Sequence, residues 1–122
     1  MFHVLRRAAE PGPGNRTVRF EGEPYGAGVS FFLVDFEPGE GPPLHRHPYP
    51  ETWVVRAGRA LFAVDDDELE VGPGDVVVAA PGTPHRFRNG GSGRLEMVCI
   101  HAAGRMTTEW LGAPERGFQG LP

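Results

Sequence analysis

Glycine and proline stand in short clusters along this chain, and no other feature limits its fold as strongly. The 122 residues include 18 Gly and 13 Pro. Both residues are unfavourable inside helices, so the chain is not expected to hold many long helices. The clusters instead separate short apolar runs, in the way that turns separate strands. A hydrophobic fraction of 39% and a net charge of only −4 argue against disorder. We therefore expect an all-β fold.

Eight strand-like runs are predicted between these clusters, and each gap between them is short and rich in turn residues. Many short strands with regular turn signals indicate a β-sandwich or barrel. At this length one domain is expected, with an N-terminal arm and linker over residues 1–15, a barrel over 16–111 and a flexible tail over 112–122. The predicted strands are Arg16–Phe20, Gly28–Phe36, Glu51–Ala57, Arg59–Val64, Asp67–Val71, Asp75–Ala79, His85–Asn89 and Leu95–His101.

Several classes of protein are disfavoured by composition. All 12 basic residues are Arg, and without lysine neither Schiff-base chemistry nor a P-loop lysine is available. The single cysteine, Cys99, excludes an internal disulfide framework and a multi-cysteine zinc site. The acidic balance argues against nucleic acid as a partner. No apolar stretch approaches the ~20 residues of a membrane span, and the first residues do not read as a secretory signal. We expect a cytoplasmic protein with no membrane partner.

Three histidines and one glutamate have the spacing of metal ligands. His45 and His47 are separated by one residue, so on an extended chain both side chains point to the same face. Glu51 opens one predicted strand and His85 opens another. Three neutral imidazoles and a carboxylate suit a divalent transition metal, namely Fe, Mn, Ni, Cu, Co or Zn. A bare His-x-His pair in a β-protein is more often a surface or core pair than a ligand pair, so the surrounding positions matter.

The positions around the first three candidate ligands resemble the first motif of the cupin superfamily. Five residues separate Gly39 from His45-Arg46-His47, three separate His47 from Glu51, and six separate Glu51 from Gly58. The second half of the chain is similar to the second cupin motif, with its proline displaced by one position. Its residues are Gly74, Pro81, Gly82, His85 and Asn89. With only 15 residues between the motifs, the chain resembles a small single-domain bacterial cupin.

This resemblance implies a double-stranded β-helix, also called a jelly-roll barrel, with one divalent transition metal ion inside. The implied ligands are His45, His47, Glu51 and His85. The implied activity is metal-centred chemistry on a small organic substrate that coordinates the metal, of the dioxygenase, isomerase or decarboxylase type. The alternative is a non-catalytic module that binds a metal or small molecule. A homodimer formed through the N-terminal segments is also expected.

Strand alternation predicts part of the pocket wall. If Glu51 points inward, so do Trp53 and Val55, and an inward His85 brings Phe87 with it. Both faces of the 95–101 run are largely apolar, so its inner face is not assigned by pattern, although we expect Met97 to line the pocket.

Two further side chains have two readings each. His101 is either a pocket group, and then the best candidate for a general acid or base, or a strand-end histidine hydrogen-bonded to backbone. Tyr49 either borders the entrance or lies on a surface loop, with the surface slightly favoured. By default, four aromatic residues are expected in the core: Phe31, Phe32, Phe36 and Phe62.

Overall fold

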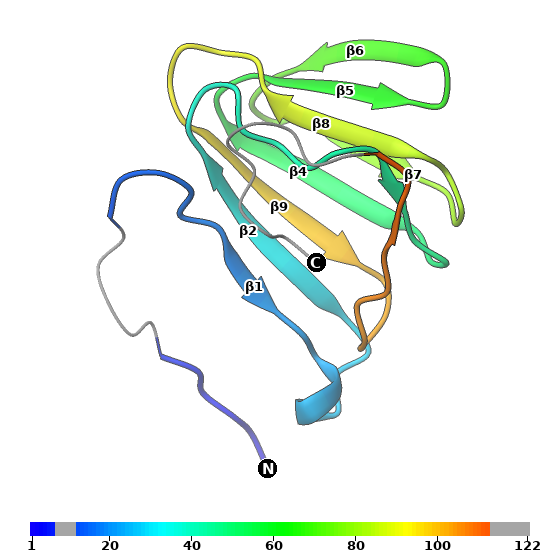
Figure 1. Cartoon of the computed structure of the whole chain (residues 1–122). Coiled ribbons are helices and arrows are strands. Elements are labelled where there is room, and N and C mark those ends of the chain that lie inside the picture. Colours follow the sequence, from blue (N-terminus) through cyan, green and yellow to red (C-terminus); the bar gives the residue numbers. More distant parts are fainter. Residues whose placement is uncertain (7–11, 113–122) are drawn as a thin grey trace.

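Two five-stranded antiparallel sheets pack face to face in the computed structural model, which describes residues 1–6 and 12–112 (Figure 1). One sheet has the strand order β1-β2-β9-β4-β7 and the other β10-β3-β8-β5-β6. The elements are β1 (Val18–Phe20), the 3₁₀ helix η1 (Glu23–Tyr25), β2 (Ser30–Phe36), β3 (His45–Arg46), β4 (Glu51–Ala57), β5 (Ala60–Val64), β6 (Asp67–Val71), β7 (Val76–Ala79), β8 (His85–Asn89), β9 (Leu95–His101) and β10 (Glu109–Trp110).

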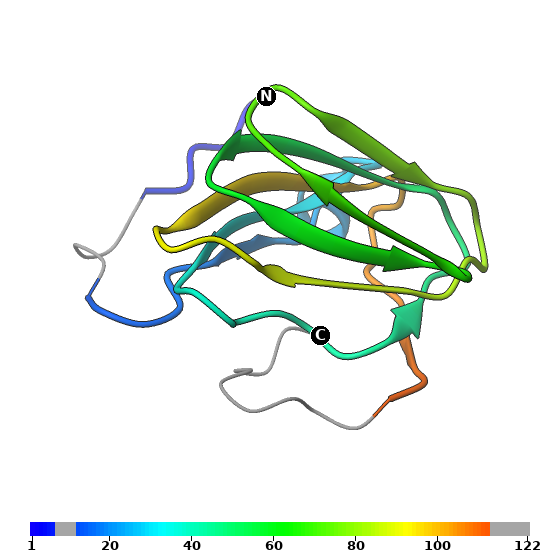
Figure 2. The same cartoon turned by 90° about the horizontal axis from the view of Figure 1, so that it is seen from above.

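The chain crosses between the two sheets at nearly every connection after β2, the β5–β6 hairpin being the exception. Seen from above, β5, β6 and β8 form one layer over β2, β4 and β9 (Figure 2). This is the double-stranded β-helix that the sequence predicts, so the expected fold class is confirmed. The largest helical element of the described residues is the three-residue η1, and none of their helices is long and apolar enough to span a membrane.

The register between β4 and β9 decides which face of β9 lies inside. Trp53 lies opposite Cys99, and Val55 lies opposite Met97. Directly opposed residues of an antiparallel pair share a face, so the buried side chains of β4 take the odd-numbered residues of β9 inward with them. Leu95, Met97, Cys99 and His101 are all at most 2% exposed. The apolar pattern of this strand alone left the choice open.

Three of the four predicted core aromatics are buried, and the fourth is not. Phe32, Phe36 and Phe62 belong to the core between the sheets. Phe31 is only half-buried and stacks on Phe20, with ring centroids 4.8 Å apart. The prediction for Phe31 was wrong because side chains alternate along β2, so two consecutive residues cannot both face inward.

Strand bounds agree closely with the prediction, except for the two shortest strands. Four predicted strands match β4, β6, β8 and β9 at both ends, and the other four start one or two residues later than predicted. Strands β3 and β10 were not predicted. Each has two residues, which is too short for a periodic pattern, and they pair with each other, Trp110 opposite His45.

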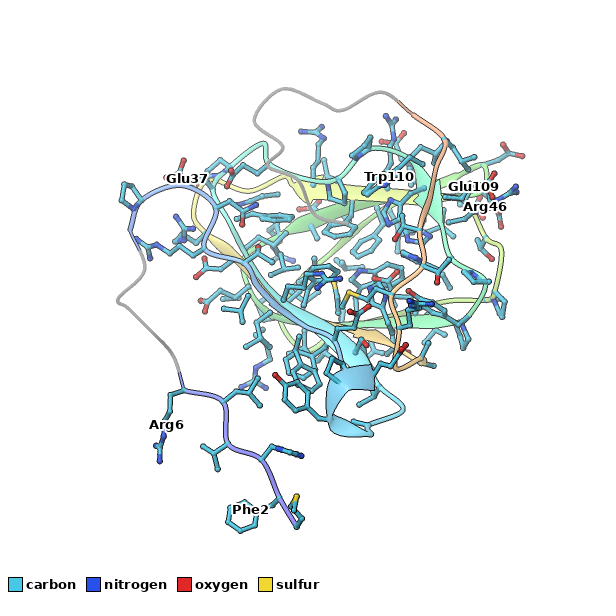
Figure 3. The ribbon with its side chains drawn as sticks, turned by 60° about the horizontal axis from the view of Figure 1, so that its bottom comes forward. Phe2, Arg6, Glu37, Arg46, Glu109 and Trp110 are labelled. Atoms are coloured by element: carbon cyan, nitrogen blue, oxygen red, sulfur yellow. The ribbon has the colours of Figure 1, made fainter. Side chains whose placement is uncertain are left out.

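The described ends of the chain differ in how they meet the barrel. Phe2 lies away from the two sheets (Figure 3), whereas Leu5 and Arg6 border a hollow at β1, β2 and β9. The linker is tied to the barrel at Gly14, whose N–H donates to the Glu37 carboxylate at 2.8 Å. Of the predicted flexible tail, only Gly112 belongs to the described residues, and its N–H donates to the Leu44 carbonyl at 3.0 Å. Residues 7–11 and 113–122 lie outside the described residues.

Candidate metal centre

Four side chains from three strands and one loop meet at one end of the barrel. His45 on β3 lies directly opposite His85 at the start of β8, and Glu51 is the first residue of β4. His47 follows β3 in the turn that leads to β4. One potential ligand atom from each of the four residues lies within 4.8 Å of the other three, and all four residues are buried. The structure thus brings together the residues that the sequence predicted as ligands.

The orientation of each of these three imidazoles is fixed from behind by a backbone carbonyl. His45 Nδ1 lies 2.7 Å from the Pro43 oxygen, and His85 Nδ1 lies 2.8 Å from the Thr83 oxygen. His47 Nδ1 lies 2.8 Å from the Thr107 oxygen. A carbonyl oxygen only accepts hydrogen bonds, so each Nδ1 carries a proton, and in the neutral form of each ring Nε2 is the nitrogen with a free lone pair. This arrangement at the far nitrogen is typical of metal-binding histidines.

The Nε2 lone pairs face a carboxylate oxygen instead of a donor. His47 Nε2 lies 2.9 Å from Glu51 Oε1, and His85 Nε2 lies 3.3 Å from the same oxygen. Within the described part of the chain, all three atoms are buried and have no hydrogen-bond partner. Buried acceptors that point at one another are unfavourable unless a cation stands between them. These three histidines and one glutamate therefore fit as ligands of one divalent transition metal ion.

Burial and mutual repulsion favour the protonation states that a metal requires. Burial and the neighbouring His85 lower the pKa of His45 from 6.5 to about 4, so this imidazole is neutral at neutral pH. Burial alone would raise the pKa of Glu51, but the neighbouring imidazoles of His101, His47 and His85 outweigh it and hold that pKa well below its ordinary value. Glu51 is therefore deprotonated, and a ligand of a metal cation must be deprotonated to bind it.

His101 and Tyr49 complete a second layer around Glu51. His101 is 1% exposed, and its Nε2 lies 3.3 Å from Glu51 Oε2, the oxygen not shared by the other imidazoles. Its Nδ1 lies 2.7 Å from the Tyr49 hydroxyl, which also accepts the Thr107 N–H at 3.1 Å. The slight preference for Tyr49 on a surface loop was wrong, because a ring between two prolines can still fold inward when a buried histidine offers a partner. His101 is a pocket group, with a side-chain partner at each nitrogen.

A small cavity, partly open to solvent, lies against the candidate centre. Burial raises the pKa of the Cys99 thiol well above its ordinary value, and Glu51 adds to this, so Cys99 contributes an uncharged wall. Trp110 stands at the mouth, its ring centroid 5.0 Å from that of His45 (Figure 3). The lining residues are Phe32, Val34, Pro42, His45, His47, Glu51, Phe87, Cys99, His101 and Trp110.

The predicted wall residues divide between the cavity and the core beneath it. Phe87 lines the cavity. Trp53 packs edge-on against His85, with centroids 4.9 Å apart, while Val55 and Met97 belong to the core cluster. The sequence reasoning missed several lining residues. Alternation along β2 carried a signal for Phe32 and Val34, whereas no local pattern pointed to Trp110.

Comparison with known families and curated proteins gives two matches. The family model described as "Cupin domain" matches residues 32–101. An uncharacterized protein of Methanocaldococcus jannaschii is 35% identical over 57 residues, which are 46% of each chain. The matched part thus spans about half the length of that curated relative.

Solved structures share the fold over most of the chain. A cupin 2 domain-containing protein from Halorhodospira halophila is 27% identical, with a TM-score of 0.70 over 86% of this chain and 75% of that one. A Klebsiella pneumoniae protein with a double-stranded beta-helix domain is 20% identical, with a TM-score of 0.70 over 86% and 90%. A Bacillus subtilis oxalate decarboxylase studied for its Mn(II) centers is 22% identical, with a TM-score of 0.69 over 83% of this chain but only 29% of that one.

Proposed function

The chain belongs to the cupin family, and from this premise we propose that it is a metal-dependent enzyme acting on a small organic molecule. His45, His47, Glu51 and His85 are the proposed ligands of one divalent transition metal ion. The observation that carries the proposal is the set of buried, partnerless lone pairs that converge on Glu51 Oε1. Each of the three imidazoles is turned toward that point by a carbonyl at its other nitrogen.

The metal, when bound, would supply Lewis acidity and an orienting template for a substrate that coordinates it, and with iron, nickel or copper also a site for O₂ chemistry. Four protein ligands would leave such an ion able to bind a substrate as well. Oxalate decarboxylases of the same fold, one of them studied for its Mn(II) centers, make decarboxylation and manganese natural candidates. Dioxygenase and isomerase chemistry remain within the proposal, because a fold does not select a reaction.

The chain's own residues would orient the substrate and exclude water. The apolar walls of Phe32, Val34 and Phe87 would disfavour water beside the ligands. His101 is the proposed general acid or base, since its imidazole lies next to the cavity and is not one of the proposed ligands. Its hydrogen bond with Tyr49 would fix the orientation of the ring.

A binding module without turnover is the second candidate, and one observation favours it. Both nitrogens of His101 already have partners, in Tyr49 and Glu51. Among the residues that line the described cavity, no other group outside the ligand set, apart from the Cys99 thiol, can move a proton. A protein that only holds a metal and its small ligand needs no such group.

We also propose that the protein is a cytoplasmic homodimer and that the outer face of the first sheet contributes to the contact. A row of directly opposed aliphatic residues crosses all five strands of this face: Val18, Leu33, Val98, Val54 and Val76. Val18, Leu33 and Val76 are 45%, 43% and 58% exposed. A contiguous apolar face of this kind is typical of a protein–protein contact.

The metal site is tested by measuring the metal content of untagged protein and of two histidine variants. His47→Ala removes a proposed ligand and is expected to lower the affinity for the metal by about a hundredfold or more. His3→Ala is the matched control, because His3 is an exposed terminal histidine outside the cluster. Wild-type protein with no stoichiometric metal, and a His47→Ala variant that behaves like it, would refute the proposal.

Turnover is tested separately, with metal-loaded protein. We expect O₂ uptake or substrate loss with one member of a panel of small enols, diols and aromatic diols. If metal-loaded protein shows no O₂ uptake and no substrate loss with any compound of the panel, the binding module or non-redox chemistry would be favoured.

A further inference from the structure

Apart from the proposed ligands and His101, the cavity beside the candidate metal centre is lined by apolar side chains, and its described lining includes no cation. Outside the proposed ligands and His101, its described lining consists of Phe32, Val34, Pro42, Phe87, Cys99 and Trp110. None of these carries a charge, and Phe32, Val34 and Phe87 are at most 5% exposed. A charge that a ligand brings into such a space is balanced only by the metal centre itself.

None of the described arginines of the neighbouring strands lines the cavity. Arg19 on β1 lies opposite Phe32, on the same face of the sheet, but its Nη2 lies 3.7 Å from Glu21 Oε2 and it does not line the cavity. Arg46 next to the ligands points outward to Glu109, with Nε 2.9 Å from Oε2 (Figure 3). Arg88 on β8 is exposed.

The proposed ligands determine the net charge of the metal centre, and this charge decides which substrate charge can be buried in the apolar cavity. A divalent ion held by three neutral imidazoles and the Glu51 carboxylate has a net single positive charge. A ligand with one negative charge makes the buried complex neutral. A dianion leaves a net negative charge among aromatic and aliphatic groups, and burying an unpaired charge is unfavourable. The space beside the ligands is also small.

From this charge balance we propose that the substrate or ligand is a small chelator that binds the metal as a monoanion and turns an apolar body toward Phe32, Val34 and Phe87. Enolates and singly deprotonated diols belong to this class, whereas dicarboxylates such as oxalate do not. The inference rests on the metal-binding function proposed above. It argues against oxalate, the substrate named for decarboxylases of the same fold, on the charge of this chain's own cavity walls.

Acetylacetonate and malonate are a matched pair of probes. They have the same number of non-hydrogen atoms and form chelate rings of the same size, but one is a monoanion with two methyl groups and the other a dianion with two further oxygens. The full chain is loaded with Co(II), and the visible absorption of Co(II) reports ligand binding without any turnover. The same titrations with Co(II) alone in the same buffer remove the intrinsic preference of the metal.

We expect the protein to favour acetylacetonate over malonate by about tenfold or more beyond the preference of free Co(II). Arg19→Met should leave this ratio unchanged, because the inference gives Arg19 no part in binding. Val34→Arg places a fixed positive charge in the wall and should shift the ratio toward malonate. Leu33→Arg, on the outer face of the same strand, is its control and should not.

The outcomes test the metal site and the preference for a monoanionic ligand separately. Failure to bind Co(II) refutes the proposed metal site, and this inference with it. Stoichiometric Co(II) binding with a ratio equal to that of free Co(II), or shifted toward malonate, overturns the inference alone. A loss of malonate binding in Arg19→Met would overturn it as well, since the site would then recruit a cation. Where Val34→Arg does not fold, the wild-type ratio decides.

Discussion

At the scale of single residues, hydrogen bonds at the rear nitrogens give the candidate metal centre its shape. His45 and His85 bond carbonyls two residues away, at Pro43 and Thr83, so their local turns orient them. His47 depends instead on the carbonyl of Thr107, sixty residues along the chain. The spacing of the histidines was visible in the sequence. The partner that fixes His47 was not, because it comes from a segment with no motif of its own.

Tyr49 is predicted to be a positioning residue for the metal site. Its hydroxyl contacts His101, which in turn contacts the second oxygen of Glu51. Tyr49→Phe removes this support and should weaken metal binding by about tenfold, measured by competition with a chromogenic chelator. Tyr25→Phe is the control, since Tyr25 lies in η1 at the surface. Equal affinities of the two variants would show that the layer behind Glu51 does not matter.

His45 predicts how the stability of metal-free protein depends on pH. Its pKa is lowered to about 4 in the folded state, against 6.5 ordinarily, so between these values the unfolded chain binds a proton that the folded protein does not. The free energy of unfolding should therefore fall as the pH is lowered from 6.5 to 4, by up to about 3 kcal/mol. Urea unfolding at several pH values measures this. His45→Gln should flatten the dependence, and a slope identical to that of wild type would contradict the assignment.

At the scale of elements, strand pairing decided what periodicity left open. Long strands such as β4 and β8 alternate cleanly, so their bounds and inner faces were predictable from the sequence. Strand β9 is apolar on both faces, and only its pairing with β4 identifies its odd-numbered residues as the inner ones. The two-residue strands β3 and β10 exist because they pair with each other, which no local pattern records.

The turn between β4 and β5 depends on Gly58. This residue has a φ of 87°, and a Cβ added there would lie 2.4 Å from the Arg94 oxygen. Gly58→Ala should lower the free energy of unfolding by about 3 kcal/mol, from backbone strain together with the clash. Gly74 has a φ of 90° but nothing within 4 Å, so Gly74→Ala should lose only about 1 kcal/mol. Chemical denaturation compares the two, and equal losses would mean that the contact with Arg94 does not matter.

At the scale of the whole molecule, one face of the barrel carries a row of aliphatic side chains, three of them exposed. The aliphatic row that runs from Val18 to Val76 lies on the outside of the first sheet, away from the cavity. The outer face of the second sheet, in contrast, carries the charged residues Arg86 and Arg88 of β8. This asymmetry is the basis for the proposed homodimer.

Leu33→Glu is expected to abolish the dimer. Leu33 lies in the middle of the aliphatic row and is 43% exposed, so a carboxylate there adds a charge to the contact without disturbing the core. Light scattering after gel filtration should give about twice 13.3 kDa for wild type and a monomer for the variant. Leu69→Glu, on β6 and 41% exposed, is the control and should remain dimeric. A monomeric wild type would refute the proposal.

The sequence by itself determined the fold class, most strand bounds and the four candidate ligands, because these depend on local alternation, turn residues and short fixed spacings. The tertiary structure alone decided the inner face of β9, the partners of His101 and the place of Trp110 beside His45. Each of these joins residues that lie more than forty positions apart. Register and strand crossing bring such residues together, and neither is encoded in a local pattern.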